Sequence, residues 1–241
     1  MIKGDIRKRQ ILETAEVLFT EKGYERTSVQ DILDVLHLSK GSFYHHFESK
    51  ELVLKTICEI QAEKNAEKFK GEGFTEGLNR MNRLLSGMIP FQGDGLVFLK
   101  MLVPVFLLPE GKSILSGYQE ALKKAWLPMT QEALKYMIIQ KTAYTIYPEM
   151  TSAILLDLVN DLWGQMSADI LRIQKEETDT VSAQKILTRL EPYRAAIENL
   201  VSAPYGSIEL MNLDLLLKVI HEFQHFYRRH EADNNIIESQ L

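Results

Sequence analysis

Apolar side chains recur three and four positions apart along most of this chain, which is the spacing of one buried face on an α-helix. The first stripe predicts a helix from about Asp5 to Lys22, with Gly23 as its C-terminal cap. Its members are Ile11, Leu12, Ala15, Leu18 and Phe19. No run of alternating apolar and polar residues indicates a β-strand, so we expect an all-α protein.

The stretch Thr27–Lys50 predicts two short helices joined by a tight turn, followed by the start of a third. Thr27 stands where it can cap the first of these helices, and Gln30, three residues later, would complete a capping box. The turn falls at His37 and Leu38. The buried face of this first helix is predicted to consist of Val29, Ile32, Leu33 and Leu36.

Ser39 is a good cap for the second short helix, whose body we expect at Lys40–Phe47. Phe43 and Phe47 are four positions apart and can anchor one side of this helix to the protein. The other side carries hydrogen-bond donors and no acidic residue, which suits insertion into a major groove of DNA. These donors are Lys40, Ser42, Tyr44, His45 and His46.

Ser49 can cap a third helix, which we expect from about residue 50 to residue 69. Beyond it, Gly and Pro breaks separate further helices, and Pro192 lies inside one stripe, which favours a kinked helix. Any surplus apolar face must be covered by a partner. The late stripes are Leu155, Leu158, Leu162, Met166, Ile170 and Ile173; Leu187, Leu190, Tyr193, Ile197 and Leu200; and Leu210, Leu213, Leu217, Ile220 and Tyr227.

The net charge of −5 favours an acidic protein without a nucleic-acid partner. Residues 1–55, however, hold nine basic and nine acidic side chains, so the deficit lies in the rest of the chain. Local arrangement decides contact with a groove, and the predicted second short helix is free of acids. We therefore keep DNA as the expected partner, with weak non-specific binding and a modest dependence on salt.

Cys58 is the only cysteine of the chain, which excludes an internal disulfide and suits a reducing compartment. It lies on the apolar side of a predicted helix, where we expect a small core residue. The most apolar run, Leu96–Leu108, contains Lys100 and Pro104 and is too short to span a bilayer. With no apolar signal segment at the N-terminus, we expect a cytoplasmic protein without a membrane partner.

The segment from about residue 6 to residue 56 resembles the signature of TetR-type transcriptional regulators. The residues that carry the resemblance are Thr27, Ser28, Val29, Ile32, the run Leu38–Phe47 and the run Ser49–Leu52. Two departures are Leu36-His37, where the family usually has Ala-Gly, and Leu33, where a small Ala is usual. Histidine tolerates the left-handed backbone region better than most residues, so we expect this turn to survive at some strain.

The resemblance implies a homodimer with a three-helix helix-turn-helix domain at residues 1–56. The helix predicted at about residues 50–69 links this domain to an antiparallel helical domain at residues 57–241 that binds a small molecule and dimerises. Family members dimerise through two late helices packed as a four-helix bundle, and we expect these to be the helices near 150–175 and 207–230. It implies a transcriptional repressor that a small-molecule effector releases from double-stranded DNA; an activator or a regulator that needs a corepressor has the same fold. For base contact the resemblance indicates Ser42, His45 and, less directly, Gln30. For phosphate contact it indicates Thr27, Ser28, Lys40, Tyr44, His46 and Lys50.

The candidate effector pocket lies between residues 70 and 175, where Met and aromatic residues gather. Methionine adapts to irregular partners and aromatic rings line apolar sites, although the same residues equally suit plain core packing. The region has no clear charge cluster, so we expect an apolar or amphipathic effector. The candidate pocket residues are Phe98, Met101, Phe106, Trp126, Met137, Tyr144, Trp163 and Met166.

The sequence His221-Glu222-Phe223-Gln224-His225 matches the H-E-x-x-H pattern of zinc proteases. The extended form is absent, because Arg228 and Glu231 stand where it needs glycine and histidine. A zinc-binding protein or metalloprotease that uses His221 and His225 is therefore the alternative function, and surface histidines are the plainer interpretation. No Walker loop, dinucleotide fingerprint or nucleophile elbow appears, so we expect neither an enzyme nor a cofactor.

Overall fold

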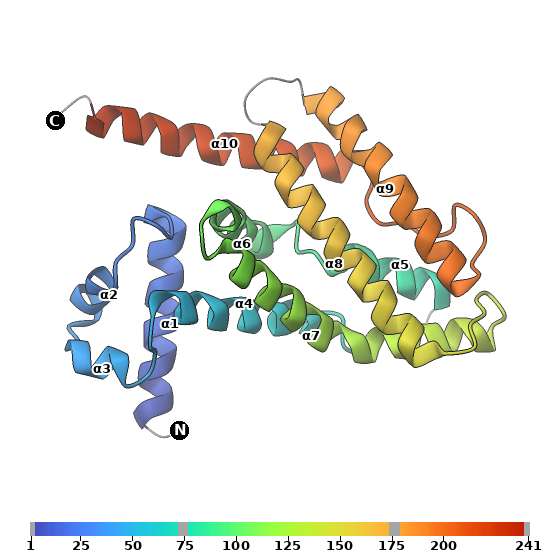
Figure 1. Ribbon diagram of the computed structural model, residues 1–241, viewed down its shortest axis with the longest axis horizontal. Coiled ribbons are helices and arrows are strands. Elements are labelled where there is room, and N and C mark those ends of the chain that lie inside the picture. Colours follow the sequence, from blue (N-terminus) through green and yellow to red (C-terminus); the bar gives the residue numbers. More distant parts are fainter. Residues whose placement is uncertain (1–2, 72–76, 174–178, 239–241) are drawn as a thin grey trace. The chain divides into compact units, whose positions relative to one another are not determined.

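The computed structural model describes residues 3–71, 77–173 and 179–238. Within these ranges the chain is all-helical and has no strand, as the sequence predicted (Figure 1). The elements are α1 (Lys3–Lys22), α2 (Val29–Leu36), α3 (Lys40–Tyr44), α4 (Lys50–Glu67), α5 (Gly77–Gly87), α6 (Gly93–Leu102), the 3-10 helix η1 (Val103–Leu107), α7 (Gly111–Ile139), α8 (Pro148–Ile173), α9 (Asp179–Val201) and α10 (Leu213–Glu238).

The helices divide into two compact units that do not follow chain order. Unit 1 comprises Met1–Lys68 and Gln92–Ala125, and unit 2 comprises Phe69–Phe91 and Trp126–Leu241. All of α4 lies in unit 1, while α7 contributes residues to both units. The functional division expected at residue 56 stays a prediction.

The core of unit 1 is built on α1, which packs against α2, α4 and α6. All five apolar residues of its predicted stripe are buried. The helix ends as expected at Gly23, which adopts a left-handed φ of 85° and donates its N–H to Phe19 O at 3.1 Å. Cys58 on α4 is also buried, and burial raises the pKa of its thiol well above the ordinary range.

The capping residue of α2 is Ser28, and the prediction of Thr27 is wrong by one position. Ser28 has extended backbone angles, its Oγ accepts the N–H of Asp31 at 3.1 Å, and Asp31 Oδ2 accepts the N–H of Ser28 at 2.7 Å. Thr27 is instead fully buried, with its hydroxyl 2.8 Å from Gly23 O. Gln30 takes no part in the cap and donates to Asp34 Oδ1 at 2.6 Å.

In unit 2, α8 and α9 run antiparallel side by side, and α10 packs on α9 (Figure 1). The predicted helix through Pro192 is one continuous element, α9. The stripe predicted for α10 is only partly confirmed, because Ile220 is buried and Leu213 is exposed. The buried face also holds Leu216, Val219 and Phe223, which the prediction did not include. The three added positions are again spaced by three and four, so the buried face is centred about one residue away from the predicted one.

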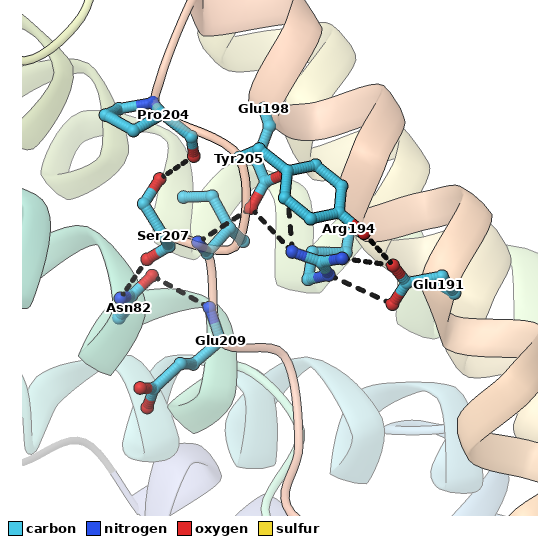
Figure 2. A network of polar contacts seen from close by, with 9 residues as sticks. Asn82, Glu191, Arg194, Glu198, Pro204, Tyr205, Ser207 and Glu209 are labelled. Carbon is cyan, nitrogen blue, oxygen red and sulfur yellow. Dashed lines mark hydrogen bonds and ion pairs between the residues drawn. The ribbon is translucent and has the colours of Figure 1, made fainter.

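A polar network fixes the connection between α9 and α10 (Figure 2). Glu198 is buried on α9, where it accepts from Arg194 Nη1 and from the N–H of Ile208, each at 3.1 Å. Asn82 of α5 binds the same connection, donating to Ser207 O at 2.8 Å and accepting from the N–H of Glu209 at 3.1 Å. Side chains thus replace the backbone partners that this loop lacks, as buried polar groups require.

We predict that Ser28→Ala lowers the free energy of unfolding by about 1 kcal/mol, because it removes the side-chain cap of α2. Urea unfolding of the full chain measures the change. The matched control is Ser116→Ala at an exposed site within α7, where alanine is the better helix former. Equal stability of the Ser28→Ala variant and the unsubstituted protein would contradict the cap assigned here.

Candidate nucleic-acid interface

A left-handed residue at the end of α2 sets the direction in which the chain enters α3. His37 has φ 50° and ψ 47°, and the next residue, Leu38, donates its N–H to Leu33 O at 2.9 Å. Together these features close the helix in the manner of a Schellman motif. The histidine that departs from the family's usual glycine therefore adopts the left-handed conformation expected of it.

Ser39 caps α3 as predicted, since its backbone is extended and its Oγ accepts the N–H of Ser42 at 3.3 Å. Regular helix ends at Tyr44, three residues earlier than expected. Helix-like hydrogen bonds nevertheless continue, because Phe47 donates its N–H to Phe43 O at 2.9 Å. The chain must turn before Lys50, where Ser49 caps α4 by accepting the N–H of Leu52 at 3.1 Å.

Phe43 and Phe47 hold this segment to the body of unit 1. Their exposed fractions are 0% and 2%, and their ring centroids lie 6.2 Å apart. The ammonium group of Lys8 on α1 lies 5.6 Å from the Phe47 ring centroid. Burying two phenylalanine side chains contributes roughly 3–6 kcal/mol of transfer free energy, which fixes which side of α3 faces outward.

The outward side of α3 carries the predicted donors. Lys40, Tyr44 and His45 are exposed, while Ser42 and His46 are half-buried. The two imidazole rings meet edge to face with centroids 5.0 Å apart. No acidic residue occurs from His37 through Phe47, so no carboxylate of this segment opposes a phosphate.

The residues predicted at the start of α2 differ in accessibility. Ser28 and Gln30 are exposed, so both side chains can reach a ligand at this surface. Thr27 has no exposed side-chain surface, and its hydroxyl lies within hydrogen-bond distance of two backbone carbonyls, those of Gly23 and Leu18. A side-chain contact between Thr27 and phosphate does not fit this position, and we withdraw it from the candidate set.

Lys50, at the first position of α4, is held by a partner that the sequence did not indicate. Its Nζ donates to Tyr24 O at 2.8 Å and lies 4.1 Å from the centroid of the Tyr24 ring. Burial lowers the pKa of Lys50, while the charges of Glu110, Glu25 and Asp31 oppose that change. Tyr24 lies in the turn between α1 and α2, 26 residues before Lys50, and no periodicity links positions that far apart.

The predicted pocket residues are divided between the two units. Phe98, Met101 and Phe106 belong to unit 1, and the other five belong to unit 2. In unit 2, Met137 and Met166 are buried, and so are two tryptophans whose indole N–H groups have no hydrogen-bond partner among the described residues.

These two tryptophans each pack against one phenylalanine. Trp126 lies 4.9 Å from Phe69 and Trp163 lies 5.7 Å from Phe91, measured between ring centroids. Tyr144 is 64% exposed, and its backbone N–H donates to Val201 O, so its side chain does not line a buried site.

His221 and His225 are both exposed on α10, with ring centroids 4.5 Å apart. A catalytic zinc site needs three protein ligands. Among the side chains that the structure describes, no group of three or more His, Cys, Asp or Glu residues is arranged to hold a metal ion. Within the same part of the chain, every helix is too short or too polar to cross a membrane.

The similarity of this chain to a known protein family lies near its N-terminus. The family described as "Bacterial regulatory proteins, tetR family" matches residues 11–57. The HTH-type transcriptional regulator YerO of Bacillus subtilis is 39% identical over 64 residues, which are 27% of this chain and 22% of YerO. The HTH-type transcriptional repressor KstR2 of Rhodococcus jostii is 43% identical over 51 residues, 21% of this chain and 25% of KstR2. These matches thus span a quarter or less of each relative.

A longer alignment covers the HTH-type transcriptional regulator UidR of Escherichia coli. The two chains are 25% identical over 170 residues, which are 68% of this chain and 83% of UidR.

Two solved structures share the fold over most of the chain. One is a protein from Syntrophomonas wolfei described as a TetR-family transcriptional regulator, with a TM-score of 0.52, 19% identity and coverage of 81% and 96% of the two chains.

The other is RolR, crystallised with the ligand resorcinol, with a TM-score of 0.51, 12% identity and coverage of 90% and 94%. The capped helix-turn-helix, the all-helical architecture and the matched family signature agree with one another. Residues 11–57 therefore match the tetR family of bacterial regulatory proteins, and the chain as a whole shares the fold of solved structures described as TetR-family regulators.

Proposed function

We propose that this protein is a ligand-responsive repressor that binds a near-palindromic DNA operator as a homodimer in the cytoplasm. The observation that carries the proposal is the position of α3. Its two rings are buried in unit 1, while its acid-free side, with Ser42 and His45, is accessible to a duplex. A short helix held in this way is the geometry by which helix-turn-helix proteins read the major groove.

We assign base contacts to Ser42 and His45, with Gln30 as a third candidate from the exposed side of α2. We assign phosphate contacts to the exposed and half-buried donors around them, because phosphate contacts position the protein while base contacts specify the sequence. The phosphate candidates are Ser28, Lys40, Tyr44, His46 and Lys50. Two copies of α3 would enter successive major grooves about 34–36 Å apart in a symmetric dimer.

Release of the DNA would follow from a second conformation of the dimer, in which α4 is placed differently and the spacing between the two copies of α3 is altered. An effector that binds this conformation better shifts the population toward it, by no more than its differential affinity for the two states. Because the helix-turn-helix and α4 belong to one compact unit, they can move together. We assign effector binding and dimerisation to residues 57–241 and DNA binding to residues 1–56, as the family resemblance indicates.

The core of unit 2 supports an amphipathic effector. It is built mainly from aliphatic, methionine and aromatic side chains, yet the indole N–H groups of Trp126 and Trp163 are buried without a partner among the described residues. A buried donor without a partner costs about 1–3 kcal/mol, which a ligand oxygen can recover. We therefore propose an apolar molecule that carries at least one hydrogen-bond acceptor.

We predict that Lys50→Ala weakens binding to every duplex alike and lowers the slope of log K against log salt by about 0.9, the value of one phosphate contact. Fluorescence anisotropy with a duplex of random sequence, at several salt concentrations, measures both quantities. Lys64→Ala, an exposed lysine at the other end of α4, is the matched control and should leave the slope unchanged. An unchanged slope in Lys50→Ala would remove Lys50 from the contact set.

His45→Ala is expected to change base preference at one position of each half-site, by on the order of 1–3 kcal/mol for a well-formed contact. Competition among duplexes with single base changes measures this preference. Its control is His225→Ala, which removes an exposed imidazole from α10 in unit 2. Equal loss on all duplexes would place His45 among the phosphate contacts.

Effector chemistry can be tested by thermal shift with a panel that compares long-chain alcohols, lactones and phenols with simple sugars and inorganic anions. We expect stabilisation by the amphipathic compounds. Trp163→Phe removes the buried donor and keeps an aromatic ring, so affinity for acceptor-bearing compounds should fall about fivefold, the equivalent of one hydrogen bond of about 1 kcal/mol. Stabilisation by sugars or anions alone would contradict an amphipathic effector.

A further inference from the structure

Two acidic residues lie on α2, and their carboxylates have different partners. Asp31 is occupied by the capping box, because its Oδ2 accepts the N–H and the hydroxyl of Ser28, while its Oδ1 accepts from Lys22 Nζ at 2.9 Å. Asp34 Oδ1 instead accepts from Gln30 Nε2 at 2.6 Å. Asp34 is thus joined to the candidate base contact of α2.

This pairing follows from the phase of α2. Residues four positions apart lie on the same side of a helix, and glutamine and aspartate at this spacing form hydrogen bonds. Two buried residues, Ile32 and Leu33, hold the helix to unit 1. Gln30 and Asp34 are both exposed, so the pair lies at the protein surface. Because a cap and a Schellman turn fix the two ends of α2, the pair has a fixed place on the helix-turn-helix.

The carboxylate of Asp34 determines which way the amide of Gln30 faces. A carboxylate only accepts hydrogen bonds, so the amide must turn its nitrogen, and not its oxygen, toward Asp34. Rotation of the amide by half a turn would place Oε1 beside the carboxylate, where two acceptors repel each other. Because a glutamine amide has two N–H donors and one oxygen, the pair leaves one N–H donor and Oε1 for another partner.

One donor beside one acceptor matches a single base in the major groove. Adenine presents N7 as an acceptor and N6 as a donor, whereas guanine presents two acceptors, N7 and O6. An unrestrained glutamine amide can offer both of its N–H groups to guanine. The amide of Gln30 has already given one N–H to Asp34, so the pair favours adenine over guanine.

We propose that Asp34 is a positioning residue for base recognition: it orients the amide of Gln30 so that the base that Gln30 contacts in each half-site is adenine and not guanine. The inference rests on the proposed function, in which Gln30 meets a base. It adds the identity of that base, and a second residue of α2, to the determinants of specificity. Since Asp34 acts through Gln30, its effect requires Gln30 to be present.

The test uses the full chain and a duplex that it selects from a random pool. Gln30→Ala first identifies the contacted base pair, as the position at which base preference is lost. Competition measured by fluorescence anisotropy then compares duplexes with adenine or guanine at that position. The unsubstituted protein should prefer adenine, and Asp34→Asn should reduce this preference about fivefold, the value of one hydrogen bond. An asparagine amide can donate as well as accept, so it no longer excludes the rotated Gln30.

Three further variants establish the route. Asp34→Glu keeps a carboxylate four positions from Gln30 and should keep the preference for adenine. Gln30→Ala combined with Asp34→Asn should show the same preference at this position as Gln30→Ala alone. Glu63→Gln removes an exposed carboxylate from α4 in the same unit and should leave the preference unchanged, which controls for net charge. Because Gln30 and Asp34 are exposed, their substitution should leave the core of unit 1 intact.

Three results would overturn the proposal: a preference of the unsubstituted protein for a base other than adenine at this position, an unchanged preference in Asp34→Asn, or an effect of Asp34→Asn that persists without Gln30. Failure of the proposed function looks different. In that case the unsubstituted protein selects no sequence, or Gln30→Ala changes the preference at no position and removes Gln30 from the base contacts.

Discussion

The structure of the candidate interface depends on the burial of Phe43 and Phe47 in unit 1. These rings leave the segment only one orientation, in which the opposite side of α3 is accessible. A helix of five residues has little stability of its own, since isolated helices of that length do not persist in water. The rings, the cap at Ser39 and the left-handed turn at His37 supply what the short helix lacks.

The compact unit that carries α3 extends beyond the helix-turn-helix and α4. Residues from Gln92 to Ala125 belong to it, so α6, η1 and the first half of α7 share its core. Within this unit, Lys55 bonds Ser113 of α7 and Lys50 bonds the carbonyl of Tyr24. The start of α4 is therefore held by contacts with two chain segments that are distant from each other in sequence.

Local patterns predicted local structure well. The stripe of α1, the caps at Ser39 and Ser49 and the left-handed His37 all follow from spacing and from the preferences of single residues. The sequence favoured Thr27 as the cap of α2, but the core buries this residue, and Ser28, one position later, caps the helix instead. Contacts between distant segments, such as the one between Tyr24 and Lys50, leave no periodic signal, and neither does the exposure of Tyr144.

The most direct test of the account is selection of bound DNA from a random pool at low ionic strength by the purified full-length protein. If α3 presents its donor side to a duplex from a symmetric dimer, the selected sequences will contain two inverted half-sites with centres about one helical turn apart. Enrichment of no sequence, or of a single half-site without an inverted copy, would contradict it.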